Sequence, residues 1–154
     1  FPEHVRARMD EATRGVQKAD ILRAFIIEKY GGIYMDADVQ PRRSLDPLLA
    51  LQEPILLCHD LPLTWEYMSS GFFGAPPHHP MFEFFCHSLM GVQLNTTDVH
   101  MHTGPRALGH AVRWAPNPSG RKYVLLPSRA FYHNAKTADA FGHHTYANSW
   151  NCPK

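Results

Sequence analysis

Apolar residues recur at helical spacing between Lys18 and Tyr30, at positions 22, 25, 26 and 27. This spacing places them on one face of a helix, as expected for a helix that packs against a core. Gly31-Gly32 follows directly, and glycine just beyond the last helical position is a strong stop signal. We therefore predict a helix over residues 18–30.

The next seven residues alternate in polarity. Tyr34, Asp36 and Asp38 are separated by single apolar residues within the segment 33–39. A period of two is typical of a β-strand with one apolar and one polar face. We predict one strand over this segment, ended by Pro41, with the three polar side chains on the same face.

Further helices and strands alternate along the rest of the chain. Helices are predicted over residues 1–14, briefly over 48–51, over 80–90, and from Pro105 until Pro116 ends the segment. Strands are predicted near residues 54–59, 71–75 and 123–126, and residues 130–154 are expected to form strand fragments and loops folded over a site. This alternation indicates a single layered α/β domain that spans residues 1–154.

Composition narrows the function classes. The chain has 154 residues, of which 44% are hydrophobic and 19% are charged, as is typical of a globular domain. Its formal net charge of +1 gives no field that would attract nucleic acid or an anionic membrane surface. No run approaches the roughly 20 apolar residues that span a bilayer, so any membrane anchor is expected outside this chain. Three scattered cysteines predict no disulfide framework.

Asp36 and Asp38 are the first candidates for chemistry. Two carboxylates one residue apart, near the end of a strand, can converge on one divalent cation. Mg²⁺ and Mn²⁺ prefer oxygen ligands, and Mg²⁺ completes its shell with water and substrate phosphates, which suits a diphosphate. The same pattern also occurs on solvated strand faces, so the motif alone does not decide between a cation site and a polar surface.

Asp20 and Arg23 lie three residues apart on the preceding helix. At this spacing they could form an ordinary surface ion pair worth roughly a few tenths of a kcal/mol. Because the helix runs through two glycines directly into the Asp-bearing strand, the pair could instead hold a carboxylate and a guanidinium beside the same ligand. Sugar hydroxyls require such paired acceptors and donors.

Two segments together resemble the sugar-binding DXD region of glycosyltransferase family 32: KADILR at residues 18–23 and YGGIYMDAD at residues 30–38. The family and its relatives include fungal α-mannosyltransferases, inositol-phosphoceramide mannosyltransferases and the large clostridial glucosylating toxins. Residues 71–80 followed by Thr103-Gly104-Pro105 are also similar to family segments. Residues 141–150 resemble the family's closing His…Ser-Trp segment, so the resemblance covers most of the chain.

This resemblance implies a GT-A-like, Rossmann-related mixed sheet flanked by helices. Family members usually carry an N-terminal strand-helix-strand region that holds the nucleotide base. The resemblance therefore implies that this chain is a C-terminal catalytic portion, a partial GT-A-like domain without that region. Ser69-Ser70 departs from the family pattern, in which Asn often precedes the central apolar strand.

The resemblance also implies roles for the first group of residues. Asp36 would support the donor ribose or the metal, Asp38 would ligate the metal directly, and Tyr34 would line the nucleotide-sugar pocket. Asp20 and Arg23 would hold the transferred hexose. The expected catalytic residues are Asp20, Arg23, Asp36 and Asp38.

Roles for the closing segment follow from the same resemblance. His144 is the expected third metal ligand, with His143 as its alternative. Asn148, Ser149 and Trp150 are expected near the donor phosphates, with the segment folded back over them.

The activity implied is that of a metal-dependent, retaining hexosyltransferase that uses Mn²⁺ or Mg²⁺. It would move a hexose from a UDP- or GDP-sugar to a hydroxyl of a glycan, a glycolipid or a protein. The alternative is a non-catalytic sugar- or metal-binding remnant of such a domain. The close Asp pair does not suit the two opposing carboxylates of a glycosidase. The resemblance fits the Golgi lumen for a eukaryotic source and the cytoplasm for a bacterial one.

Other His and aromatic residues have structural explanations. His100-Met101-His102 and His143-His144 could suggest zinc, but no convergent ligand set with recognisable spacing accompanies them. His78, His79 and His87 are expected to cap or flank a helix. Trp65, Trp114 and the Phe82-Phe84-Phe85 cluster are expected in the core.

Overall fold

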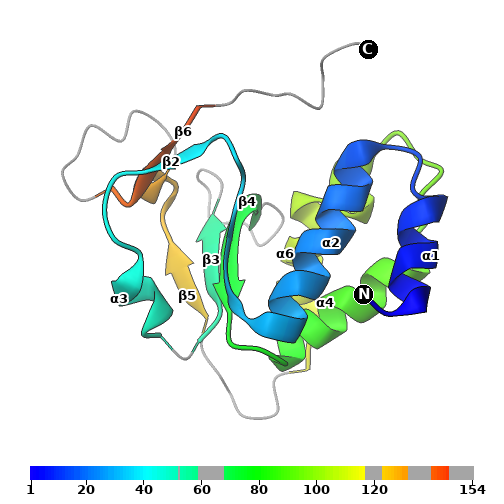
Figure 1. The fold of residues 1–154 in the computed structure, drawn as a ribbon, viewed down its shortest axis with the longest axis horizontal. Coiled ribbons are helices and arrows are strands. Elements are labelled where there is room, and N and C mark those ends of the chain that lie inside the picture. Colours follow the sequence, from blue (N-terminus) through cyan, green and yellow to red (C-terminus); the bar gives the residue numbers. More distant parts are fainter. Residues whose placement is uncertain (52, 59–67, 117–122, 132–139, 146–154) are drawn as a thin grey trace.

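The computed structural model describes residues 1–51, 53–58, 68–116, 123–131 and 140–145 (Figure 1). The elements follow in the order α1 (Glu3–Glu11), α2 (Gly15–Tyr30), β1 (Gly32–Met35), β2 (Val39–Pro41), α3 (Asp46–Leu49), β3 (Ile55–Cys58), β4 (Met68–Ala75), α4 (Pro80–Gly91), α5 (Val99–His102), α6 (Pro105–Trp114), β5 (Val124–Leu126), the short 3-10 helix η1 (Ser128–Ala130) and β6 (Gly142–His144). None of the helices in these residues combines the length and the hydrophobicity of a membrane-spanning segment.

Strand β4 lies inside the larger sheet, whose strand order is β1-β4-β3-β5. It is antiparallel to β1 and β3, whereas β3 and β5 run parallel. The smaller sheet pairs β2 antiparallel with β6. Helices α2, α4 and α6 lie together on one side of the larger sheet, and α3 lies on the other (Figure 1). The molecule is thus a mixed sheet flanked by helices, which confirms the predicted fold class.

Both faces of β4 are buried because consecutive residues of a strand point to opposite sides. Phe73 packs toward the helices, with Ile27 of α2 and Phe82 of α4 in the same cluster. Phe72 faces the other way, and its ring centroid lies 4.0 Å from that of Phe131. Apolar packing on two sides therefore fixes β4, whose first half borders the candidate site.

Helix α2 ends where the sequence predicts, because Gly31 adopts a conformation that other residues avoid. Its φ of 66° and ψ of −163° fall in a region essentially reserved for glycine. Its N–H donates to the Ile27 carbonyl at 2.9 Å. A Cβ at Gly31 would lie 2.6 Å from Cδ of Pro77. This turn leads the chain from α2 directly into β1, as predicted.

The prediction of a single strand over residues 33–39 is wrong. Strand β1 ends at Met35, and a turn closed by the Val39 N–H and the Asp36 carbonyl, 3.0 Å apart, separates it from β2. The period-two pattern suits each short strand equally well and does not reveal the turn between them. Asp36 still hydrogen-bonds to β4 through its N–H and the Gly71 carbonyl, at 2.9 Å, whereas Asp38 lies in the turn just before β2.

The structural roles predicted for other aromatic and His residues are mostly confirmed. His79 caps α4, since its Nδ1 accepts a hydrogen bond from the Met81 N–H at 3.2 Å. Phe82 and Phe85 are buried. The prediction for Trp114 is wrong: it is 58% exposed in the last turn of α6, where its apolar ring lies near the Arg113 guanidinium. Trp65 lies outside the described residues.

Candidate active site

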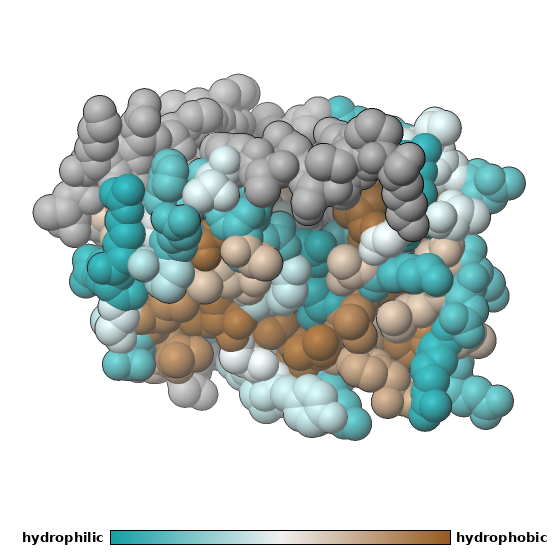
Figure 2. All heavy atoms as spheres, turned by 45° about the horizontal axis from the view of Figure 1, so that its top comes forward, coloured by the Kyte–Doolittle hydropathy of each residue, from teal (hydrophilic) through white to brown (hydrophobic). Residues whose placement is uncertain are grey.

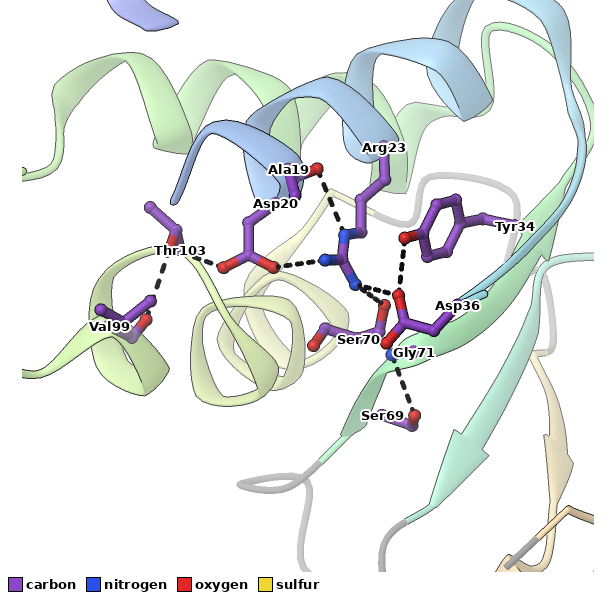
Figure 3. Close-up of polar contacts among 10 residues, drawn as sticks. All are labelled: Ala19, Asp20, Arg23, Tyr34, Asp36, Ser69, Ser70, Gly71, Val99 and Thr103. Atoms are coloured by element: carbon purple, nitrogen blue, oxygen red, sulfur yellow. Dashed lines mark hydrogen bonds and ion pairs between the residues drawn. The ribbon is translucent and has the colours of Figure 1, made fainter. Parts of the chain in front are cut away.

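Asp20 and Arg23 form a buried ion pair on α2, not the surface pair that their spacing also allowed. Asp20 is 2% exposed and Arg23 is 7% exposed. Arg23 Nη2 lies 3.4 Å from Asp20 Oδ1, and Nη1 lies 3.0 Å from Asp36 Oδ1 (Figure 3). One guanidinium thus bridges the helix carboxylate and the first carboxylate of the DXD motif.

Further contacts fix the orientation of the Arg23 guanidinium. Nε donates to the Ala19 carbonyl at 3.2 Å, and Nη1 donates to the Ser70 carbonyl at 2.6 Å. The Tyr34 ring centroid lies 4.7 Å from Arg23 Cζ, within the range of a cation–π contact. Because Ser70 contributes its backbone oxygen, the departure from Asn in this segment leaves this contact intact.

Asp36 is held on its Oδ1 by two donors. The Tyr34 hydroxyl donates to it at 2.6 Å, and Arg23 donates to the same atom. Burial and the neighbouring Asp36 raise the pKa of Tyr34 well above its usual value, so the hydroxyl remains a donor at physiological pH. The Asp36 side chain keeps 30% exposure and is therefore open to a ligand while its orientation is fixed.

Thr103 is a site residue whose contact the sequence did not predict. Its hydroxyl donates to Asp20 Oδ2 at 2.8 Å, and it is itself buried (Figure 3). The sequence singled out Thr103-Gly104-Pro105 as a family segment and a helix start, but α5, which precedes it, was not predicted. Helix α5 begins at Val99 after an N-cap, Asp98, whose Oδ1 accepts from the Met101 N–H at 3.1 Å.

The environment of Asp20 is unusual for a carboxylate. Burial raises its pKa from 3.8 to about 6, against the opposing effects of the Arg23 charge and the Thr103 hydrogen bond. A carboxylate that stays ionised at neutral pH under such desolvation is costly for folding. Costly buried polar groups concentrate at functional sites, which makes Asp20 a candidate for ligand binding.

Asp38 and His144 are brought together by the smaller sheet. Thr145, just after β6, donates from its N–H to the Asp38 carbonyl at 2.9 Å. His144 stands opposite Val39 in the β2–β6 register, and its Nε2 lies 3.4 Å from Asp38 Oδ1. His143 precedes it on β6 and points to the other face, since strand residues alternate.

Asp36, Asp38 and His144 each offer one ligand atom, and all three atoms lie within 4.8 Å of one another. Carboxylate oxygens suit Mg²⁺ and Mn²⁺, and an imidazole nitrogen favours the transition metal of the two. Three protein ligands leave places for water and phosphate oxygens in an octahedral shell. The residues therefore fit a divalent cation, whose binding stays a prediction. Asn148, Ser149 and Trp150 lie outside the described residues.

A cleft of about 150 Å³ opens beside the ion-pair cluster. Asp20, Arg23 and Asp36 line it, so Asp36 belongs both to the cleft and to the candidate metal ligands. Figure 2 shows polar atoms recessed near the centre of one face of the molecule, between apolar patches on both sides. The arrangement can hold a small polyhydroxyl group in the cleft and a cation at its edge.

Residues 4–54 match the family described as "Glycosyltransferase sugar-binding region containing DXD motif". This match contains α2, the Gly-Gly turn and both aspartates of the motif. These residues belong to the sugar-binding region of this glycosyltransferase family. The four residues expected to be catalytic, Asp20, Arg23, Asp36 and Asp38, all lie in the matched region, whereas Thr103 and His144 come from beyond it.

The chain is also similar to several fungal glycosyltransferases. It is 42% identical over 67 residues to "Mannosyl phosphorylinositol ceramide synthase SUR1" of Saccharomyces cerevisiae, covering 44% of this chain and 16% of the relative. It is 32% identical over 111 residues to "Inositol phosphoceramide mannosyltransferase 2" of Schizosaccharomyces pombe, covering 67% and 31%. Against "Mannosyl phosphorylinositol ceramide synthase CSH1" of S. cerevisiae, identity is 32% over 128 residues, covering 77% and 33%. The chain spans a third or less of the length of these relatives.

Proposed function

We propose that this glycosyltransferase chain supplies the sugar- and metal-binding part of a hexosyltransferase that uses a nucleotide-diphosphate sugar. The transferred hexose is mannose, because the similar fungal proteins are named as mannosyl transfer enzymes. The acceptor is a glycolipid hydroxyl, in keeping with the inositol phosphoceramide in those names. The same assay also tests a glycan or a protein as the acceptor, and both UDP- and GDP-linked sugars as the donor.

One observation carries the proposal: a single buried guanidinium joins Asp20 to Asp36 on the wall of a cleft. Arg23 bridges both carboxylates and offsets one of their two negative charges, and both can accept hydrogen bonds from sugar hydroxyls. Charge-assisted hydrogen bonds are stronger than neutral ones and fix the direction of the ligand. The hexose lies over Arg23 and Asp20, with its phosphate end toward Asp36.

Asp36, Asp38 and His144 would hold Mn²⁺ or Mg²⁺ at that end of the cleft. A cation bound there supplies positive charge against the negative charge that develops on a leaving diphosphate. Tyr34 and Arg23 keep Asp36 oriented toward both the sugar and the cation. Asn148, Ser149 and Trp150 are proposed to contact the phosphates. Retention of the anomeric configuration follows the family resemblance, and the anomer of the product, read by NMR, tests it.

The experiment that tests this function compares donor turnover with nucleotide binding in the native protein and in Arg23→Lys. The lysine keeps the positive charge but loses the planar fork that bridges Asp20 and Asp36. We expect Mn²⁺-dependent release of nucleotide from GDP-mannose or a UDP-hexose to fall at least about tenfold. Binding of free GDP or UDP should change much less, because the fork is assigned to the sugar.

Arg113→Lys is the matched control, since Arg113 stacks near Trp114 on α6 and does not line the cleft. It should leave both measurements unchanged. Equal losses of turnover and nucleotide binding in Arg23→Lys would place Arg23 in the scaffold. Donor binding without any turnover by the native protein, across the donor panel, would favour the non-catalytic remnant.

A further inference from the structure

The cleft extends past the sugar-binding residues to a rim of different chemistry. Its lining includes Arg14, just before α2, and Thr97 and His100 around α5. Asp38 and His144 are absent from the lining. Of the three candidate metal ligands only Asp36 lines the cleft, so we place the donor diphosphate at the Asp36 side and not at this rim.

The backbone of Arg14 is fixed although its side chain is exposed. Its N–H donates to Gln17 Oε1 at 3.1 Å. Gln17 is fully buried, and its Nε2 donates to the Leu94 carbonyl at 2.8 Å. This chain of hydrogen bonds sets the point on the cleft rim from which the Arg14 guanidinium extends.

The charge of Arg14 is available to a ligand. No described carboxylate forms a salt bridge with Arg14, and Asp20 and Asp36, the carboxylates of the cleft, are both bridged by Arg23. The first turn of α2, a 16-residue helix, adds partial positive charge beside Arg14. His100 adds an imidazole ring, which can donate a hydrogen bond to an anion. The rim therefore favours an anion, while the floor of the cleft favours hydroxyl groups.

We propose that Arg14, assisted by His100, binds a phosphate ester carried by the acceptor next to its accepting hydroxyl. This inference rests on the proposed function and assigns a residue of the cleft rim to the phosphate of the acceptor. A guanidinium offers two parallel donors to two phosphate oxygens, which selects phosphate over a neutral polyol. Because Arg14, Asp20 and Arg23 line the same cleft, an accepting hydroxyl beside that phosphate would face the hexose on Asp20 and Arg23.

The test measures transfer of the hexose to three acceptors at saturating donor and Mn²⁺. Inositol phosphoceramide in detergent micelles presents a lipid phosphodiester, inositol 1-phosphate presents a soluble phosphate, and inositol presents none. For Arg14→Ala, we expect kcat/KM for both phosphate-bearing acceptors to fall. This fall should be about tenfold larger than the fall in donor hydrolysis or in transfer to inositol. Arg14→Lys should recover part of the loss, because the charge remains without the fork.

Arg6→Ala is the matched control, because Arg6 lies on exposed α1, contacts the Phe1 carbonyl and does not line the cleft. A loss with the micellar acceptor alone would assign Arg14 to the lipid surface and overturn a phosphate subsite. Loss of donor affinity equal to the loss of transfer would place an anionic group of the donor at Arg14 instead. If native protein shows no Mn²⁺-dependent donor turnover, the proposed function itself fails. Binding of inositol 1-phosphate that Arg14→Ala leaves unchanged, measured by calorimetry, would then overturn the subsite separately.

Discussion

Replacing Asp20 with asparagine should make the protein more stable at neutral pH while changing a residue that we propose contacts the sugar. Burial raises the pKa of Asp20 to about 6 from 3.8, so the folded state binds this proton more tightly than the unfolded state does. The native protein therefore loses stability as pH rises from about 4 to about 6, relative to a protein with a neutral side chain there. Above that pH range, the stability lost to the buried Asp20 charge no longer changes with pH.

The magnitude follows from the two pKa values. A shift from 3.8 to about 6 corresponds to roughly 3 kcal/mol between the two protonation states. Asparagine has nearly the shape of the protonated acid and can still accept a hydrogen bond from Thr103. Asp20→Asn should thus gain up to about 3 kcal/mol of unfolding free energy at pH 7.5 and almost nothing at pH 4.

Urea denaturation at a series of pH values measures this difference directly. Asp10→Asn, an exposed carboxylate on α1, is the control and should give a curve parallel to that of the native protein. The reasoning is refuted if the difference in unfolding free energy between Asp20→Asn and the native protein does not grow between pH 4 and pH 7. That result would show that Arg23 offsets the burial of Asp20 more completely than the geometry implies.

Three further changes test other parts of the structure. Thr103→Val removes a hydrogen bond that lowers the pKa of Asp20. The acid limb of a pH–rate profile of donor turnover should therefore move to higher pH. If the acid limb does not move, Asp20 is not the group that titrates there. Tyr34→Phe should weaken donor binding by about tenfold in calorimetry with little loss of stability, because Asp36 loses one orienting donor. Gly31→Ala should cost about 1–3 kcal/mol of unfolding free energy in urea, because its φ is 66°, whereas Gly15→Ala, with open space around it, should not.

Much of the fold follows from local signals in the sequence. The apolar spacing of α2, the glycines after Tyr30 and the proline that opens α4 each act within a few residues, and each boundary lies close to its predicted place. The strand over residues 33–39 was predicted incorrectly because pairing decides where a strand ends. Asp36 bonds to Gly71 of one sheet, whereas Val39 pairs with β6 of another.

The candidate site could be predicted only in part for the same reason. The spacing of Asp20 and Arg23 allowed either a surface pair or a ligand site, and the burial of both residues, with Thr103 and Ser70 as partners, decides against the surface pair. Thr103 reaches Asp20 across 83 positions of sequence, a contact that no local pattern encodes. The same holds for Arg14, which lines the cleft together with Val99 and His100 of α5, residues far from it in the sequence.

The most direct test of the central claim is the Mn²⁺ dependence of donor binding in native protein and in Asp38→Asn. The asparagine removes one carboxylate charge from the candidate ligand group and keeps its shape. We expect the native protein to bind GDP-mannose or a UDP-hexose only when Mn²⁺ is present, and Asp38→Asn to need about 10- to 100-fold more Mn²⁺ for the same occupancy. Donor binding that is independent of Mn²⁺, or equal in the two proteins, would contradict a metal-dependent sugar site at Asp36, Asp38 and His144.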